Sequence, residues 1–401
     1  MGFKAFCFAL FCILYASYLY KPIPGNIKET WKVMALDASA KTCMLVASFL
    51  ENIGIMRFED FISKIIMMDY TQSTSDEYIT VTDTTFNDVP VRLYLPKKKS
   101  ETPKRAVIYI HGGAFCLGSF KQASYDFLNR WTANRLDAVV VALDYRLAPQ
   151  YHFPVQFEDG LAAVKHFLQD NILKKYGVDP NRICISGDSS GGTLTAAITQ
   201  EMQNYPEMKS KIKMQALVYP GLQIIDSHLP SHLENKHSII LTRDIAIKFV
   251  SLYLTKDEEL PRAIERNQHM PLESRHLFKF TNWSTLLPEK LKKNRIYTAS
   301  VLGGYNSSLP GLMDIRAQPL LANDSLLRTL PSTYIITCQY DIFRDDGFMY
   351  ATRLRNLGVQ VTHHNLEDGF HGALSYMTFP FYLQLGFRIR DMYINWLDQN
   401  L

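Results

Sequence analysis

The sequence lacks internal repeats and low-complexity tracts, so nothing in it indicates a repeat array or a disordered linker. It also lacks a charge imbalance, because the formal net charge of +4 is spread along the chain. The one dense basic patch, from Lys97 to Arg105, is typical of a solvated loop before the apolar run that follows it. We therefore expect no nucleic-acid partner.

Cysteine is scarce, with six residues in 401, and none stands beside histidine at a zinc-binding spacing. His228, His232 and His237 share a loop that contains proline, which is more typical of loop residues than of metal ligands. We expect neither a metal ion nor a cofactor. Cys184 lies in an apolar run, where a buried thiol is expected.

We find one long apolar run, Ala5 to Tyr20, which is sixteen residues without a charge between Lys4 and Lys21. It is close to the lower limit of about 17 residues for a membrane span. Small residues before a cleavage site are imperfectly placed, so residues 1–20 are either a cleaved signal peptide or an uncleaved signal anchor. A signal anchor would associate the protein with a membrane. We expect no other run to cross a bilayer.

The most informative motif is the pentapeptide 187–191, which spells Gly-Asp-Ser-Ser-Gly. It follows an apolar, β-branched run over 182–186 and precedes a helix-like stretch that begins at Gly192. A serine on such a sharp strand-to-helix turn presents its hydroxyl above the sheet, while the helix N-terminus directs amides at a developing oxyanion. We predict that Ser189 is a nucleophile.

A serine nucleophile needs a base, and the base needs a carboxylate that orients it. In the α/β-hydrolase order both partners follow the serine along the chain. One strand-like run, 331–338, leads to Asp341, and another, 359–364, leads through a glycine-rich loop to His371. Because ligands bind beyond the carboxyl ends of strands in α/β sheets, we predict Asp341 as the acid and His371 as the base.

Neighbouring titratable residues are alternatives for these two roles. Asp345 and Asp346 fall at a helix start, where acidic residues commonly cap the helix or complement its dipole. His363 and His364 belong to the strand itself. We expect the remaining acidic pair, Glu367–Asp368, to cap a loop or to be solvated.

The third part of the chemistry is an oxyanion hole. The apolar run 106–110 is typical of a central strand, and His111, Gly112 and Gly113 follow it at once. Glycines in such a loop free backbone amides to act as donors. We predict that the amides of Gly112, Gly113 and Ser190 are the donors and that His111 braces the loop.

Strand-like and helix-like runs alternate along the chain, which predicts a mostly parallel sheet flanked by helices, the α/β-hydrolase fold. About a hundred residues separate the run 214–219 from the run 331–338, too many for a structureless loop. Thr242 is placed to cap a helix over 244–250 within that insert. We predict one hydrolase domain over 21–401, with a helical cap from about 25–70 and 222–330.

Together these motifs resemble the arylacetamide deacetylase family, in the hormone-sensitive-lipase-like group of α/β-hydrolases. The segments that carry the resemblance are His111–Gly113, Asp144–Pro149, Gly187–Gly192, Tyr340–Asp341 and Asp368–Gly372. It extends over the whole chain, including Pro271–Leu277. It implies the triad Ser189, Asp341 and His371 and the oxyanion motif at His111–Gly113.

The resemblance implies further features. The family usually has a third glycine where this chain has Ala114, and we expect the added methyl group to narrow the acyl pocket. Family members bridge the pair that matches Cys116 and Cys338, which implies a disulfide in a lumenal protein. The family also implies glycosylation at Asn282.

Three Asn-x-Ser triplets begin at Asn282, Asn306 and Asn323. All three fall in the insert or just before the strand that leads to Asp341, as expected for a surface that faces a lumen. We therefore expect a protein of the secretory pathway, either secreted or in the lumen of the endoplasmic reticulum.

The function indicated by these motifs is a serine hydrolase that cleaves carboxylic esters or amides with small acyl groups on lipophilic molecules. One alternative is a lipase for neutral lipid esters. Another is a hydrolase fold that only binds ligands, which would require a broken triad, whereas every expected position is filled.

Overall fold

The computed structural model describes residues 15–17, 19–98, 102–305 and 309–401. Its centre is a sheet with the strand order β1-β2-β4-β3-β5-β6-β7-β8. The strands are β1 (Ile79–Phe86), β2 (Val89–Pro96), β3 (Lys104–Ile110), β4 (Ala138–Leu143), β5 (Val178–Asp188), β6 (Ile212–Val218), β7 (Ser332–Tyr340) and β8 (Val361–Phe370). The predicted mostly parallel sheet is confirmed, because only the β1–β2 and β2–β4 pairs are antiparallel.

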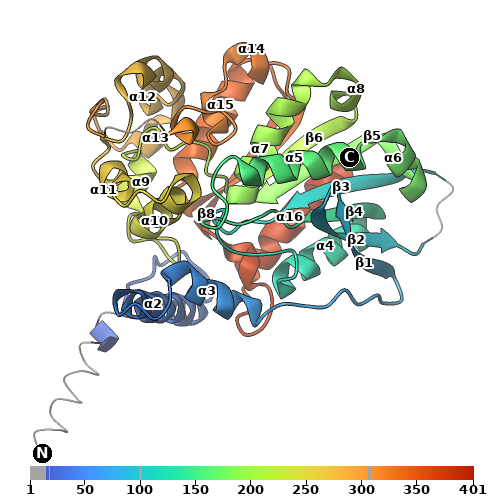
Figure 1. The fold of residues 1–401 in the computed structure, drawn as a ribbon, viewed down its shortest axis with the longest axis horizontal. Helices are drawn as coiled ribbons and strands as arrows, with labels where there is room; N and C mark the ends of the chain where they lie inside the picture. The colour runs from blue at the N-terminus through green and yellow to red at the C-terminus, as the bar shows by residue number, and fades with distance from the viewer. Residues whose placement is uncertain (1–14, 18, 99–101, 306–308) are drawn as a thin grey trace, which may run out of the picture.

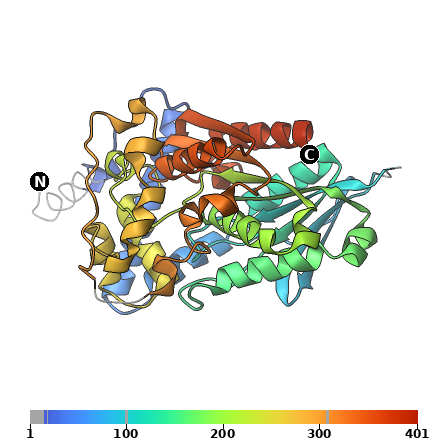
Figure 2. The ribbon, with the colours of Figure 1, turned by 90° about the horizontal axis from the view of Figure 1, so that it is seen from above.

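Helices cover both faces of the sheet (Figures 1 and 2). One face packs against α4 (Ala123–Leu136) and α16 (Gln384–Asn400). The other packs mainly against α5 (Val155–Phe167), α7 (Ser190–Glu201) and α15 (Arg344–Asn356). The shorter α6 (Asp170–Tyr176), α8 (Pro206–Lys209) and α14 (Asp324–Leu327) each precede a strand, β5, β6 and β7 respectively. Because β4 is buried along its whole length, its continuous apolar sequence suits a strand covered on both faces.

Two helical segments lie together at one end of the molecule (Figures 1 and 2). The first contains α2 (Thr30–Asn52) and α3 (Phe58–Met67). The second is the insert between β6 and β7, with α9 (Pro230–Glu234), α10 (Arg243–Leu254), α11 (Leu260–Glu265), the 3₁₀ run Leu272–Phe280, α12 (Trp283–Leu286) and α13 (Glu289–Lys292). They meet where Lys248 of α10 pairs with Glu51 of α2 at 2.6 Å. The Thr242 cap is confirmed, because its hydroxyl accepts the Ile245 amide at 3.4 Å.

Two local expectations need correction. The strand predicted to end at His364 continues to Phe370, so Glu367 and Asp368 lie in β8 and His371 follows it directly. Helix α2, in turn, is long and apolar enough to cross a membrane by length and composition alone, because its most apolar 18-residue window has a mean hydropathy of 1.5. The expectation that no run after Tyr20 is long enough to span a bilayer was therefore wrong as regards length and composition.

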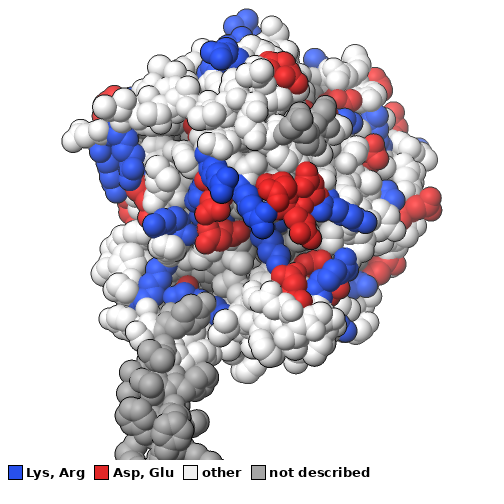
Figure 3. All heavy atoms as spheres, turned by 60° about the vertical axis from the view of Figure 1, so that its left-hand side comes forward, with Lys and Arg blue, Asp and Glu red and all other residues white. Residues whose placement is uncertain are grey.

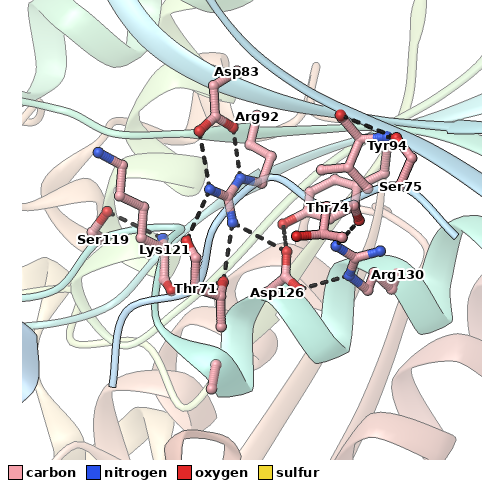
Figure 4. Close-up of polar contacts among 12 residues, drawn as sticks. Thr71, Thr74, Ser75, Asp83, Arg92, Tyr94, Ser119, Lys121, Asp126 and Arg130 are labelled. Atoms are coloured by element: carbon pink, nitrogen blue, oxygen red, sulfur yellow. Dashed lines mark hydrogen bonds and ion pairs between the residues drawn. The ribbon is translucent and has the colours of Figure 1, made fainter. Parts of the chain in front are cut away.

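A buried arginine joins the segment after α3 to the sheet (Figure 4). Arg92 of β2 is 1% exposed, and its guanidinium donates two hydrogen bonds to Asp83 of β1, at 2.7 and 3.0 Å. It also donates to Asp126 of α4 at 3.2 Å and to the hydroxyl and carbonyl of Thr71 at 3.1 and 3.2 Å. We call these four residues the Arg92 cluster. It connects the N-terminal helices, through Thr71, to two strands and a helix of the hydrolase core.

Candidate active site

Ser189 lies on the turn between β5 and α7, as predicted. Its backbone has φ 53° and ψ −124°, a conformation that is strained for any residue other than glycine. The surrounding backbone holds it there, since the Ser189 amide donates to the Val218 carbonyl at 2.9 Å. The side chain is half-buried at the N-terminus of α7.

Glycines on either side of Ser189 allow backbones to approach closely. A Cβ atom on Gly187 would lie 2.4 Å from the Gly191 carbonyl oxygen. One on Gly191 would lie 2.0 Å from the carbonyl oxygen of Ile110 in β3. The turn that presents Ser189 therefore needs both glycines, which explains the motif physically.

His371 and Asp341 complete a hydrogen-bonded line from the serine. Nε2 of His371 lies 2.8 Å from Oγ of Ser189, and Nδ1 lies 2.8 Å from Oδ2 of Asp341. Asp341 is fully buried, and its Oδ1 accepts the Phe343 amide at 2.9 Å. The imidazole packs between the rings of Tyr219 and Phe343, with ring centroids 4.8 and 5.5 Å away. The structure thus brings the three predicted residues together.

The insert holds the loop that carries Asp341, a feature that the sequence analysis missed. Asn235 donates to the carbonyls of Gln339 and Asp341 at 3.2 and 2.9 Å. The hydroxyl of Ser238 donates to the Tyr340 carbonyl, and that of Ser231 donates to the Ile342 carbonyl at 2.6 Å. Four successive carbonyls therefore accept side-chain donors from α9 and the residues that follow it.

Asp345 and Asp346 lie in the first turn of α15, as predicted, but both are fully buried. Asp345 accepts the Ser231 amide at 2.7 Å and pairs with Arg344 at 2.9 Å. Asp346 accepts the amides of Leu222 and Gln223 at 2.8 and 3.3 Å, and burial raises its pKa to about 8. These carboxylates bind the start of the insert and do not contact His371.

The oxyanion loop requires one correction. The amide of Gly112 donates to the Tyr125 hydroxyl and to Oδ1 of Asp188, both at 3.0 Å, so it is not free to bind an oxyanion. Asp188 is buried beside three tyrosine hydroxyls, and burial raises the pKa of its carboxyl group. The sequence did not reveal this, because Gly112 and its acceptors lie far apart along the chain.

The next two amides of the loop have no protein acceptor among the described residues. They belong to Gly113 and Ala114, which are partly exposed and have φ values of 123° and 55°. Ala114 packs against the cluster of Ala47, Phe58 and Phe249. The narrowing of an acyl pocket by its methyl group stays a prediction.

The buried ring and the carbonyl of His111 hold the oxyanion loop in place, in line with the bracing role predicted for this residue. Its ring is 1% exposed and stacks on Tyr145 with centroids 4.4 Å apart. The Tyr145 hydroxyl donates to the His111 carbonyl at 3.0 Å, and Nε2 of His111 lies 3.3 Å from Asp144. The predicted Asp144–Pro149 motif thus positions the oxyanion loop.

The predicted Cys116–Cys338 disulfide is absent, because both residues are free, buried thiols. Cys116 packs with residues of α2, α3 and α10, and its thiol donates to the Phe249 carbonyl at 3.6 Å. Cys338 packs in a different cluster on the sheet. Burial raises the pKa of both thiols, which disfavours the reactive thiolate.

Other predicted sites are placed as follows. Asn282 is half-buried at the N-cap of α12, and its side chain accepts the Ser284 amide at 3.1 Å. Asn323 caps α14, whereas Asn306 lies outside the described residues. Within the described part of the chain, no group of three His, Cys, Asp or Glu side chains is arranged to hold a metal.

A cavity of about 970 Å³ lies between α3 and the loops after β3 and β4. Met56, Met67, Cys116 and Tyr145 are among its lining residues, but Ser189 and His371 are not. This cavity is therefore separate from the serine, although it reaches the Tyr145 side chain that supports the oxyanion loop.

Several known proteins are similar to this chain in sequence or in fold. Residues 107–273 and 269–375 match the α/β-hydrolase fold family. The chain is 70% identical to human (Homo sapiens) arylacetamide deacetylase-like 2 over 401 residues, which is 100% of both chains. It is 50% identical to rabbit (Oryctolagus cuniculus) arylacetamide deacetylase over 402 residues, again 100% of both.

More distant proteins share the fold. Neutral cholesterol ester hydrolase 1 of Pongo abelii is 41% identical over 395 residues, 97% of each chain. The structure of a thermostable carboxylesterase from a metagenomic library aligns with a TM-score of 0.61 at 26% identity, covering 86% of this chain and 95% of that one. The chain therefore belongs to the arylacetamide deacetylase family of α/β-hydrolases.

Proposed function

We propose that the protein hydrolyses carboxylic esters or amides with small acyl groups on lipophilic molecules, through a triad of Ser189, His371 and Asp341. The observation that carries the proposal is the continuous line of two 2.8 Å contacts from the serine through the imidazole to a buried carboxylate. The identities of 50% and above to arylacetamide deacetylases support the choice of substrate class.

The reaction proceeds in two halves. His371 accepts the Ser189 proton as Oγ attacks the carbonyl carbon, and Asp341 holds the imidazole in the required tautomer. The amides of Gly113, Ala114 and Ser190 stabilise the oxyanion at the N-terminus of α7. His371 then protonates the leaving alcohol or amine, and water releases the acyl group by the reverse sequence. Ala114 replaces Gly112 as a proposed donor, because the Gly112 amide is already bound.

We also propose that residues 25–70 and 222–330 together form a cap over the site. The chain would act in the secretory pathway, either secreted or in the lumen of the endoplasmic reticulum. The charge-free run before α2 supports this localisation. Endoglycosidase treatment of the protein from secretory cells tests it, with Asn282 as the expected acceptor. An unshifted band would argue for a cytosolic protein or unused sequons.

The decisive experiment labels the protein with a fluorophosphonate probe and then offers acetyl esters, acetanilides and emulsified long-chain esters. We expect Ser189→Ala to remain folded, to resist labelling and to lose hydrolysis of every substrate. Neutral lipid ester hydrolysis is the second candidate, supported by the 41% identity to neutral cholesterol ester hydrolase 1. A preference for the long-chain emulsion over the short soluble esters would select it. Full activity of folded Ser189→Ala would refute the mechanism.

A further inference from the structure

Exposed apolar side chains are concentrated on the N-terminal helices. Among the described residues, twenty large apolar side chains are exposed, and eleven of them lie between Tyr20 and Met68. They include Trp31 at 72%, Phe49 at 59% and Met68 at 82% exposure. Concentrations of this kind on a soluble protein mark an interaction site.

The exposed surface of α2 also lacks charge. Every exposed residue from Trp31 to Ile55, eleven in all, is uncharged, although 20% of the whole chain is charged. Figure 3 shows few charged side chains over the lower part of the face that it draws, beneath a band of crowded Lys, Arg, Asp and Glu. A face that met only water would carry more charge.

The exposed residues form a single face of α2. At 3.6 residues per turn, Trp31, Phe49 and Ile53 fall on one side of the helix, and the buried Val33 and Leu36 fall on the opposite side. Lys32 and Lys41 lie at the two edges of the exposed face, each also paired with a neighbouring carboxylate. Apolar and aromatic residues between flanking lysines are the pattern of a helix that lies in a membrane interface.

Contacts with the core show that α2 lies along the protein body. Asp37 accepts the Ile240 amide at 3.3 Å, and Glu51 pairs with Lys248 of α10 at 2.6 Å. A helix held in this way along one side cannot be surrounded by acyl chains as a membrane span would be. Its composition therefore indicates contact with lipid on one face only.

The N-terminal run favours a bilayer as the occupant of this face. Residues 5–20 carry no charge, and the described end of that run lies against α2. The Tyr15 and Thr42 hydroxyls are 2.7 Å apart, and Lys41 donates to the Leu19 carbonyl at 3.3 Å. The described end of the apolar run, at Tyr15 and Leu19, thus lies beside α2.

We propose that the α2–α3 face lies flat on a lipid bilayer, with Trp31, Phe49 and Ile53 in the boundary between headgroups and acyl chains. This contact is additional to any anchoring by residues 1–20 and is independent of hydrolysis. In the neighbouring segment, Ile65 of α3 and Met68, which follows it, are also exposed apolar residues.

Tryptophan fluorescence tests the proposal in the full chain. Trp283 and Trp396 are buried, so Trp131→Phe leaves Trp31 as the exposed reporter, and Trp31→Phe is the matched control that keeps Trp131. The protein is reconstituted into phosphatidylcholine vesicles with brominated acyl chains. We expect loss of Trp31 emission to the bromine atoms and protection from aqueous iodide, but no bromine quenching in the control.

Charge substitution gives a second test. Phe49→Glu with Ile53→Glu should abolish bromine quenching of Trp31, whereas Leu272→Glu with Ile296→Glu, two exposed apolar residues of the insert, should leave it intact. Iodide quenching of vesicle-bound Trp31 would overturn the proposal. Shielding of Trp31 from both quenchers would also overturn the proposal, because a second copy of the chain or the N-terminal run would then cover this face. Because neither test uses activity, failure here is separate from failure of the proposed function.

Discussion

Two carboxylates five positions apart in the sequence, Asp341 and Asp346, have different partners. Asp341 is hydrogen-bonded to His371 and to one backbone amide, whereas Asp346 is hydrogen-bonded to two backbone amides and to the Gln223 side chain. At the scale of single residues, the bonding partner therefore separates a proposed catalytic acid from a structural one.

Substitution of Asp341 tests its proposed role as the catalytic acid. We expect Asp341→Asn to lower kcat by about 10⁴-fold, because an amide favours the wrong imidazole tautomer. Asp345→Asn is the matched control, since it removes a buried carboxylate that does not touch His371. Steady-state kinetics with an acetyl ester, at a temperature where both variants are folded, checks this. Equal losses in the two variants would mean that the acid is wrongly assigned.

Asn235 is a positioning residue, because it acts on the Asp341 loop and not on the substrate. We expect Asn235→Ala to lower kcat by up to about a hundredfold with little change in KM, since displacement of a catalytic group by about 1 Å has that effect. Asn235→Gln tests whether the amide alone is sufficient, and thermal unfolding monitors the fold. An unchanged kcat in folded Asn235→Ala would show that the loop holds its shape without the insert.

The sequence identified the members of the proposed triad more completely than the residues that support them. Gly-x-Ser-x-Gly and the order of acid and base are local patterns, so Ser189, Asp341 and His371 could be found without coordinates. The orientation of the Gly112 amide depends on Tyr125 and Asp188, which only the fold brings near it. Asn235 had no local signal at all.

At the scale of elements, the parallel strands were predictable from apolar runs, but the β1–β2 hairpin was missed. Its signal was present, because alternating residues flank Asn87 and Asp88, whose positive φ values of 47° and 65° suit a tight hairpin turn. The C-terminal part of β8 was missed because its sequence carries no strand signal. Polar residues such as Glu367 and Asp368 resemble a loop, although they lie in the edge strand β8, at a point where its register with β7 shifts.

The close approach of α7 to β3 at Gly191 leads to a prediction about stability. Gly191→Ala should lower the free energy of unfolding by about 3 kcal/mol or more, because its Cβ would overlap the carbonyls of Ile110 and His111. Gly25→Ala is the matched control, since no atom lies within 4 Å of the added Cβ, and we expect a change within about 0.5 kcal/mol. Urea unfolding measures both. Similar values for the two variants would contradict the close approach.

At the scale of the whole molecule, Asp346 makes stability depend on pH. Its pKa is about 8 in the folded protein, against an ordinary value of 3.8 for an aspartate side chain, so between these values the folded state holds a proton that the unfolded chain has released. Between these values the free energy of unfolding falls as pH rises, by up to about 1.4 kcal/mol per pH unit. We expect Asp346→Asn to flatten this decline between pH 5 and pH 8, measured by urea unfolding at each pH. Parallel curves for the variant and the parent would contradict it.

The Arg92 cluster has a consequence for how the chain can be divided. A truncated protein that begins at Ile79 would lose Thr71, and with it two of the hydrogen bonds that a nearly inaccessible guanidinium donates. The N-terminal helices are therefore not a detachable module, and exchanging them between related enzymes would succeed only if the junction lies upstream of Thr71.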